Sequence, residues 1–128
     1  NGDTIVVVRK GEQIGIGLYG IDTPEQGQPF GKKANQFTVN LVLGKRISIE
    51  RMARDKHGRE QALIFIGKTL VNEELVKAGL AWVHWKYCHL PICESWKNLQ
   101  LRARIDKRGL WRESNPVPPW EFRRKKRE

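Results

Sequence analysis

The sequence lacks several features that would narrow its class at once. No run of apolar residues approaches the length of a membrane-spanning helix, which argues against a membrane-spanning protein, and no signal peptide is visible. The chain opens at Asn1 without a methionine, so we expect a processed or trimmed chain whose targeting segment would be out of view. No internal repeat occurs, which argues against a repeat architecture. Its 128 residues predict one domain, large enough to bury a core.

Cysteine is scarce, with only Cys88 and Cys93 in the chain. On a continuous helix the two would lie too far apart to bond, but Pro91 between them predicts a turn that brings them together. The pattern favours a small local disulfide, and with it an oxidising compartment, secreted or periplasmic. Two buried thiols are the alternative. A zinc site is not expected, because His84 and His89 nearby lack the usual spacing of zinc ligands.

Acidic residues are in the minority, with 14 Asp and Glu against 24 Lys and Arg, for a net charge of +10. This excess favours a polyanionic partner, of which nucleic acid is the commonest. A solvated basic surface is the alternative. The run from Arg123 to Arg127 supports that alternative, because a terminal charge run is typical of a disordered end.

The spacing of apolar and turn residues predicts strands alternating irregularly with helices. We expect strands at Thr4–Arg9, Gln13–Ile21, Lys45–Met52 and Glu60–Ile66, and helices at Gly31–Leu43, around Leu75 and Val76 with Asn72 as cap, and at Ile92–Lys107. Without a repeated β-α-β pattern, this order predicts an α+β fold, a small antiparallel barrel with packed helices. Trp82, Trp96 and Trp111 are expected in the core.

A polar stretch ends the second of these strands. Pro24 cannot donate a ladder hydrogen bond, so the strand stops and leaves the carboxylates of Asp22 and Glu25 at its end, with Thr23 between them. Oxygen ligands at such a junction suit a hard cation such as calcium. We expect two other polar clusters, Asn1–Thr4 and Asp55–Arg59, to meet this stretch.

With these motifs in hand, the sequence resembles the staphylococcal nuclease (thermonuclease) family over nearly its whole length. The matching segments are Asn-Gly-Asp-Thr at 1–4, Leu-Tyr-Gly-Ile-Asp-Thr-Pro-Glu at 18–25, Asp-Lys-His-Gly-Arg at 55–59, Val71 to Ala81, and Ala103 to Trp111. The resemblance implies a five-stranded antiparallel OB-fold barrel with three helices. It implies a domain over residues 1–112, followed by a proline-containing basic tail over 113–128.

The resemblance also implies calcium-dependent cleavage of DNA and RNA phosphodiester bonds. Asp3 and Asp22 match the calcium carboxylates, and Thr23 matches the ligand that offers its backbone carbonyl. Glu25 matches the general base, and Arg59 matches the arginine that binds the scissile phosphate. The positions around the nucleotide's terminal phosphate and base are those of Lys56, His57, Trp85 and Tyr87.

Three departures from the family pattern bear on activity. Gly17 stands where the family has its second phosphate-clamping arginine, which predicts a slow nuclease, because one transition-state donor can supply on the order of 10²–10³ in rate. Asn1 replaces an acidic residue, and the family's first strand is absent from the sequence. An exposed sheet edge would follow, so a strand-exchanged dimer is an alternative to the expected monomer.

Two other functions stay open at this point. One is a non-catalytic nucleic-acid-binding OB module, in which the barrel and basic surface persist without chemistry. The other is a protein-interaction module that keeps only the fold, which the net charge disfavours. A salt titration separates these two, since phosphate contacts weaken steeply with added salt. No membrane partner is expected.

Overall fold

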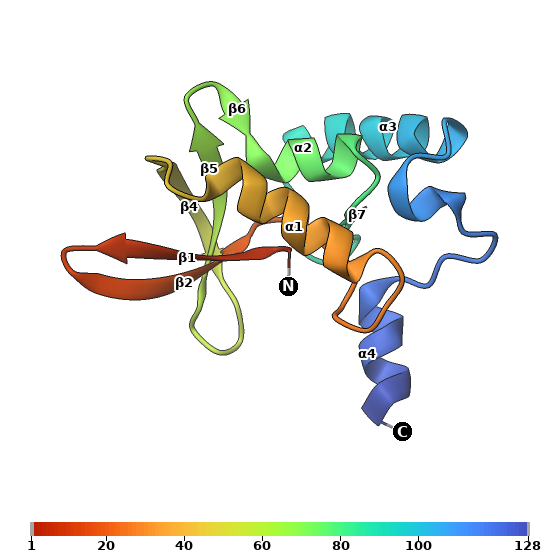
Figure 1. Ribbon diagram of the computed structural model, residues 1–128, viewed down its shortest axis with the longest axis horizontal. Coiled ribbons are helices and arrows are strands. Elements are labelled where there is room, and N and C mark those ends of the chain that lie inside the picture. Colours follow the sequence, from red (N-terminus) through yellow and green to blue (C-terminus); the bar gives the residue numbers. More distant parts are fainter. Residues whose placement is uncertain (1, 128) are drawn as a thin grey trace.

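The computed structural model describes residues 2–127 as a strongly twisted sheet with helices packed on it (Figure 1). The strands are β1 (Thr4–Arg9), β2 (Glu12–Leu18), β3 (Ile21–Asp22), β4 (Ser48–Arg54), β5 (Glu60–Ile66), β6 (Thr69–Leu70) and β7 (Trp82–Val83). The helices are α1 (Gly31–Val42), α2 (Val71–Lys77), α3 (Ile92–Ile105), the short 3-10 helix η1 (Gly109–Arg112) and α4 (Pro119–Arg127). No helix in this part of the chain is long and apolar enough to cross a membrane.

The main sheet has the strand order β1-β2-β5-β4, with β6 paired to β5. β1 and β2 form an antiparallel hairpin, β4 and β5 form another, and β2 runs parallel to β5. The α+β class is therefore confirmed, and the topology is consistent with an OB-fold. Within residues 2–127 the sheet does not close into a barrel, and the β2–β5 pairing departs from the all-antiparallel arrangement expected. In the described residues β1 pairs only with β2, so it forms an edge of the sheet. The strand-exchanged dimer stays a prediction.

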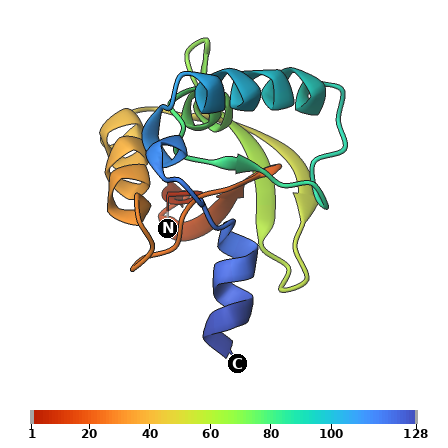
Figure 2. The same cartoon turned by 90° about the vertical axis from the view of Figure 1, so that its right-hand side faces the viewer.

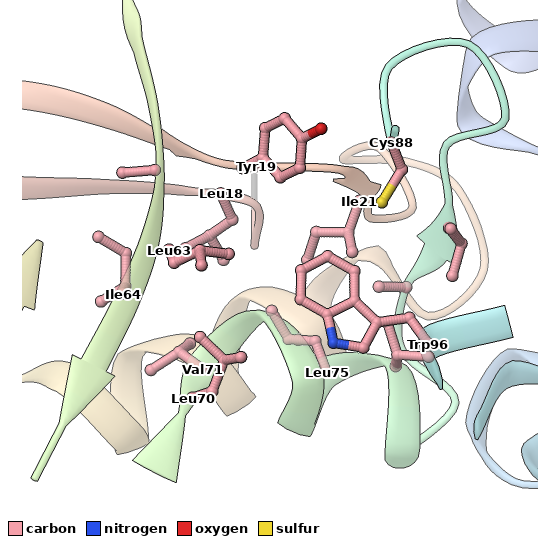
Figure 3. Close-up of a cluster of buried hydrophobic side chains, with 14 of the residues drawn as sticks. Leu18, Tyr19, Ile21, Leu63, Ile64, Leu70, Val71, Leu75, Cys88 and Trp96 are labelled. Carbon is pink, nitrogen blue, oxygen red and sulfur yellow. The ribbon is translucent and has the colours of Figure 1, made fainter. Parts of the chain in front are cut away.

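The larger of two apolar clusters in the described residues lies between the sheet and the helices (Figure 3). Leu18 from β2, Ile64 from β5 and Leu75 from α2 are all at most 1% exposed, and Trp96 from α3 is completely buried. Their burial explains the strand and helix periodicity of the sequence, because each element turns one apolar face to this centre. The tryptophan expectation holds for Trp96 and Trp111, which are buried, whereas Trp82 is only half-buried.

Asn72 has a different role from the helix cap expected of it. Its side chain is completely buried and joins three segments: Oδ1 accepts from the backbone N–H of Ile64 at 3.1 Å, and Nδ2 donates to the carbonyls of Tyr19 and Ala62, both at 3.1 Å. The residue at the cap position is Leu70, with no side-chain hydrogen bond. Asn72 therefore ties α2 to β5 and to the chain that leaves β2.

The C-terminal segment is helical, whereas its run of basic residues suggested a disordered end. Residues Pro119–Arg127 form α4, which extends away from the sheet in Figures 1 and 2. In both views α4 and the β4–β5 hairpin project from the same side of the molecule. The division of the chain at residue 113 stays a prediction, but the tail beyond it is a folded part of this structure.

Candidate active site

The polar stretch after β2 owes its path to Gly20. This residue has φ of 77°, a conformation that favours glycine, and a Cβ there would lie 2.6 Å from the sulfur of Cys88. The chain bends at Gly20, and β3 then pairs with β7 so that Asp22 lies opposite Trp82. β3 ends at Asp22, two residues before Pro24. The bend leaves Asp22 only 4% exposed, so its carboxylate needs a positive partner.

Asp3 meets Asp22 at this point, as the sequence predicted. The backbone of Asp3 accepts a hydrogen bond from Leu18 N–H at 2.7 Å, and its Oδ2 accepts from Thr23 N–H at 3.2 Å. Burial, together with the adjoining charge of Asp22, raises the pKa of Asp3 to about 6. Asn1, the other polar residue of this cluster, lies outside the described residues. The two carboxyl groups therefore adjoin, and burial raises the pKa of both.

A cationic side chain from α4 is already bound to these acids. Arg123 Nη1 and Nη2 donate to the two carboxylate oxygens of Asp22 at 3.1 and 2.7 Å, and Nη1 also donates to Glu25 Oε2 at 2.8 Å. These bonds to Asp22, and then to Glu25, raise the pKa of Arg123 above its usual range. Burial nevertheless keeps the pKa of Asp22 raised. A residue about one hundred positions away thus completes the cluster.

Aromatic packing holds α4 over this cluster. The ring of Trp120 lies 5.7 Å from that of Trp82 and 4.6 Å from that of His84, centroid to centroid, and Pro119 is almost fully buried. Upstream of the helix, Gln28 Nε2 donates to the carbonyl of Val117 at 2.6 Å. The placement of Arg123 therefore rests on packing that lies outside its own ion pairs.

His84 forms one wall of the cluster as a neutral ring. Its Nδ1 accepts a hydrogen bond from Lys86 N–H at 3.2 Å, which places the ring proton on Nε2, the atom 4.0 Å from Asp22 Oδ2. Burial, with the positive charges of Arg123 and Lys86, lowers the pKa of His84 to about 4. The ring is therefore neutral near pH 7, and its Nε2 lies too far from Asp22 for a hydrogen bond.

Comparison with known proteins identifies the family of this chain. A family model described as staphylococcal nuclease homologue matches residues 15–113. The chain belongs to this family. It is 37% identical over 127 residues to a protein named an uncharacterized endonuclease in Escherichia coli, covering 98% of this chain and 81% of the relative.

Two further relatives carry more specific names. Staphylococcal-like nuclease CAN1 of Arabidopsis thaliana is 38% identical over 112 residues, which are 88% of this chain and 34% of the relative. Thermonuclease of Staphylococcus hyicus is 32% identical over 119 residues, 87% of this chain and 70% of the relative. The chain thus spans most of the bacterial relatives but only about a third of the plant one.

The basic residues of the nuclease pattern lie on the β4–β5 hairpin. Asp55 Oδ1 accepts hydrogen bonds from the backbone N–H groups of His57 and Arg59, both at 2.9 Å, and shapes the turn. The guanidinium of Arg59 pairs with Asp55 at 3.3 Å and is half exposed. Lys56 and His57 are exposed. Within residues 2–127, Arg59 forms its polar contacts inside its own hairpin, so its phosphate role stays a prediction.

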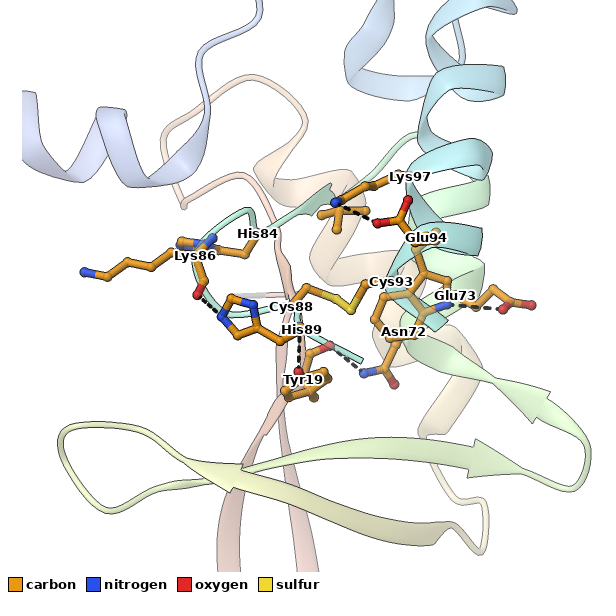
Figure 4. The surroundings of a disulfide bond; sticks show 12 residues. Tyr19, Asn72, Glu73, His84, Lys86, Cys88, His89, Cys93, Glu94 and Lys97 are labelled. Atoms are coloured by element: carbon orange, nitrogen blue, oxygen red, sulfur yellow. Dashed lines mark hydrogen bonds and ion pairs between the residues drawn. A yellow bond between two sulfur atoms is a disulfide. The ribbon is translucent and has the colours of Figure 1, made fainter. Parts of the chain in front are cut away.

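Trp85 and Tyr87 lie on the loop after β7. The same loop leads to the disulfide drawn in Figure 4. Cys88 and Cys93 are bonded, with 5.8 Å between their Cα atoms, which confirms the expected local disulfide. Trp85 is 68% exposed and Tyr87 56% exposed, with the Tyr87 ring 4.6 Å from that of His84. This exposure is compatible with stacking on bases, a role that stays a prediction.

The position of the missing arginine, Gly17, is covered by another side chain. Gly17 pairs with Gln61 across β2 and β5, and a Cβ at Gly17 would lie 2.6 Å from Oε1 of Gln61. Gln61 Nε2 in turn lies 3.5 Å from Asp55 Oδ2. Gln61 therefore occupies the space above Gly17 and connects it to the hairpin of Arg59.

The donor set fits a hard cation such as calcium in its chemistry. Asp3 and Asp22 supply adjoining carboxylates, and the buried Thr23 Oγ1 has no hydrogen-bond partner within the described residues. No group of three or more His, Cys, Asp or Glu residues is arranged as a metal site between residues 2 and 127. The role of these oxygen atoms as calcium ligands therefore stays a prediction.

Sequence reasoning missed two residues of this cluster, Arg123 and His84. No local signal marked them, since Arg123 stands in a charge run and His84 between aromatic residues. The segment Pro118-Pro119-Trp120 does signal that a helix follows, because proline favours the first turn of a helix, and it could have predicted an ordered α4. Its contact with Asp22 depends on the tertiary structure alone.

Proposed function

We propose that this chain is a calcium-dependent nuclease that hydrolyses phosphodiester bonds of DNA and RNA. The observation that carries the proposal is the adjoining pair of the half-buried Asp3 and the buried Asp22, with Glu25 beside Asp22 on the same polar stretch. Membership of the staphylococcal nuclease family and the net charge of +10 support it.

Asp3, Asp22 and the backbone carbonyl of Thr23 would hold the calcium ion. The bound ion would supply two effects, a lowered pKa of water and a positive charge for a phosphate oxygen. Glu25 would accept a proton from the attacking water, a role that requires it within hydrogen-bond reach of that water. In this structure the Glu25 carboxylate is held in place by Arg123 and its backbone N–H donates to Gln28 Oε1 at 2.9 Å.

Arg59 would bind the scissile phosphate from the β4–β5 hairpin. Its half-exposed guanidinium can leave Asp55, because a surface ion pair contributes only about 0–1 kcal/mol. Two parallel hydrogen bonds to a phosphate would replace that contact. Lys56, His57, Trp85 and Tyr87 would contact the rest of the nucleotide. The disulfide supports the further proposal that the protein works outside the cytoplasm.

The test is hydrolysis of single-stranded DNA with calcium and with a chelator. We expect calcium-dependent cleavage that Glu25→Gln lowers by roughly 10²–10⁴-fold, the usual contribution of a general base. Glu12→Gln, at the exposed start of β2, removes the same charge away from the cluster and should leave the rate within about twofold. DNA binding without cleavage by the unaltered chain, sensitive to salt, would overturn the proposal in favour of a non-catalytic binding module.

A further inference from the structure

The guanidinium of Arg123 uses only part of its hydrogen-bonding capacity on the acids. An arginine side chain carries five N–H donors in a planar fork. Three of them point to Asp22 and Glu25, two from Nη1 and one from Nη2. The Nε–H and the second Nη2–H remain, and they lie parallel on the opposite edge of the group.

This second edge has no acceptor among residues 2–127. The Arg123 side chain is 38% exposed, so the carboxylates hold the guanidinium without sealing it from solvent. An edge with two parallel N–H donors matches two oxygens of one phosphate, a geometry that lysine cannot reproduce. The acids thus orient an arginine whose free edge suits a phosphate group.

The position of Arg123 also corresponds to a need of the site. β2 offers no cationic side chain beside the acids, because Gly17 has none and Gln61 covers it. Arg59 is engaged within its own hairpin. Arg123 is the cation that directly contacts Asp22 and Glu25 in the described part of the chain.

We propose that Arg123 is a catalytic residue that binds the scissile phosphate through its Nε and Nη2 edge and replaces the arginine absent at Gly17. This inference rests on the proposed nuclease function. It gives α4 a defined task, in which Trp120 keeps the guanidinium beside the reacting group.

The arginine and a calcium ion can occupy the site together. A carboxylate has about four lone-pair positions, and Arg123 takes one on each oxygen of Asp22, which leaves positions for a cation. The ionised carboxylates of Asp3, Asp22 and Glu25 carry three negative charges, which balance one divalent cation and one guanidinium. Both cations therefore have compensating charge.

The experiment compares Arg123→Ala and Arg123→Lys with Arg124→Ala. Arg124 is exposed on the same helix, so its removal changes the net charge equally at a neighbouring position. We expect Arg123→Ala to lower the rate of single-stranded DNA cleavage by on the order of 10²–10³-fold. Arg123→Lys should lower it at least tenfold, whereas Arg124→Ala should stay within about twofold. Arg123→Lys keeps a positive charge beside the acids. Thermal unfolding of this variant checks that the protein, including α4, remains folded.

A second readout does not depend on cleavage. Binding of a fluorescent oligonucleotide in EDTA should weaken on the order of tenfold in Arg123→Ala, and no more than twofold to threefold in Arg124→Ala. If the unaltered chain proves inert, the nuclease proposal fails, and this binding difference alone decides whether Arg123 contacts phosphate. Equal losses in the two variants would overturn the inference.

Two cleavage results also overturn it while leaving the nuclease proposal intact. A rate unchanged in Arg123→Ala would make Arg123 a structural ion-pair partner. A raised rate would make it a group that competes with the cation for Asp22. A rescue experiment adds support: Gly17→Arg in the Arg123→Ala background should recover at least tenfold of the lost rate, because both positions would serve the same phosphate.

Discussion

The buried side chain of Asn72 offers the sharpest test of how the core positions the site. It is completely buried and bonds to the backbone of Ile64, Tyr19 and Ala62. Tyr19 directly precedes the bend at Gly20 that delivers Asp22 to the cluster. Asn72→Ala would remove all three bonds and leave the Ile64 N–H buried without a partner.

The cost follows from these contacts. The unpaired Ile64 N–H should cost about 1–3 kcal/mol, and each lost bond to Tyr19 and Ala62 about 0.5–1.5 kcal/mol. The carbonyl of Ala62 keeps a second donor, Tyr19 N–H at 2.8 Å, which limits its share. We expect the free energy of unfolding to fall by about 4 kcal/mol, a large part of the roughly 5–15 kcal/mol typical of a domain.

Urea unfolding followed by tryptophan fluorescence measures this change. Asn35→Ala is the matched control, because Asn35 is exposed on α1 and its side chain forms no hydrogen bond with residues 2–127; its effect should stay within about 0.5 kcal/mol. A loss below about 1 kcal/mol in Asn72→Ala would refute the reasoning, since it would mean that the three backbone groups find other partners without Asn72.

Three further predictions concern the disulfide, the hairpin and α4. Reduction of the Cys88–Cys93 bond, with a sequence separation of 5, should lower the free energy of unfolding by about 2 kcal/mol in urea titrations. The Cys88→Ser/Cys93→Ser variant has no disulfide, so reductant should leave its free energy of unfolding unchanged; an equal fall in that variant would contradict the prediction. Burial raises the pKa of Asp55, but hydrogen bonds from Arg59 and His57 N–H and the Arg59 charge outweigh it and lower that pKa. Its stabilisation should therefore be complete above the unfolded pKa of about 3.9 and disappear as pH falls through the lower folded value, so the urea midpoints of the unaltered chain and Asp55→Asn should converge only in acid; a constant difference would count against it. Trp120→Ala should speed hydrogen exchange in α4 and lower cleavage as Arg123→Ala does, while α1 to α3 keep their protection; Lys125→Ala should do neither.

Much of the fold was available from the sequence, because local patterns determine it. The strands Thr4–Arg9 and Glu60–Ile66 follow their β-branched and apolar residues to the residue, and the helix over Gly31–Val42 ends one residue before its predicted end. Boundaries shifted where glycine intervened: the predicted strand to Ile21 is divided by the bend at Gly20. The family, the local disulfide and the meeting of Asp3 with Asp22 were likewise readable from motifs and spacing.

The tertiary structure alone decided how the acids are paired. Asn72 became a buried connector because α2 docks against β5, a packing event with no local signature. The path of α4 depends on the contact of Trp120 with Trp82 and His84, which lie more than thirty residues away along the chain. Charge patterning alone places Arg123 in solvent. Folding brings the buried carboxylate of Asp22 and the partly buried carboxylate of Glu25 together, and this makes it favourable for one arginine of a basic run to bind there.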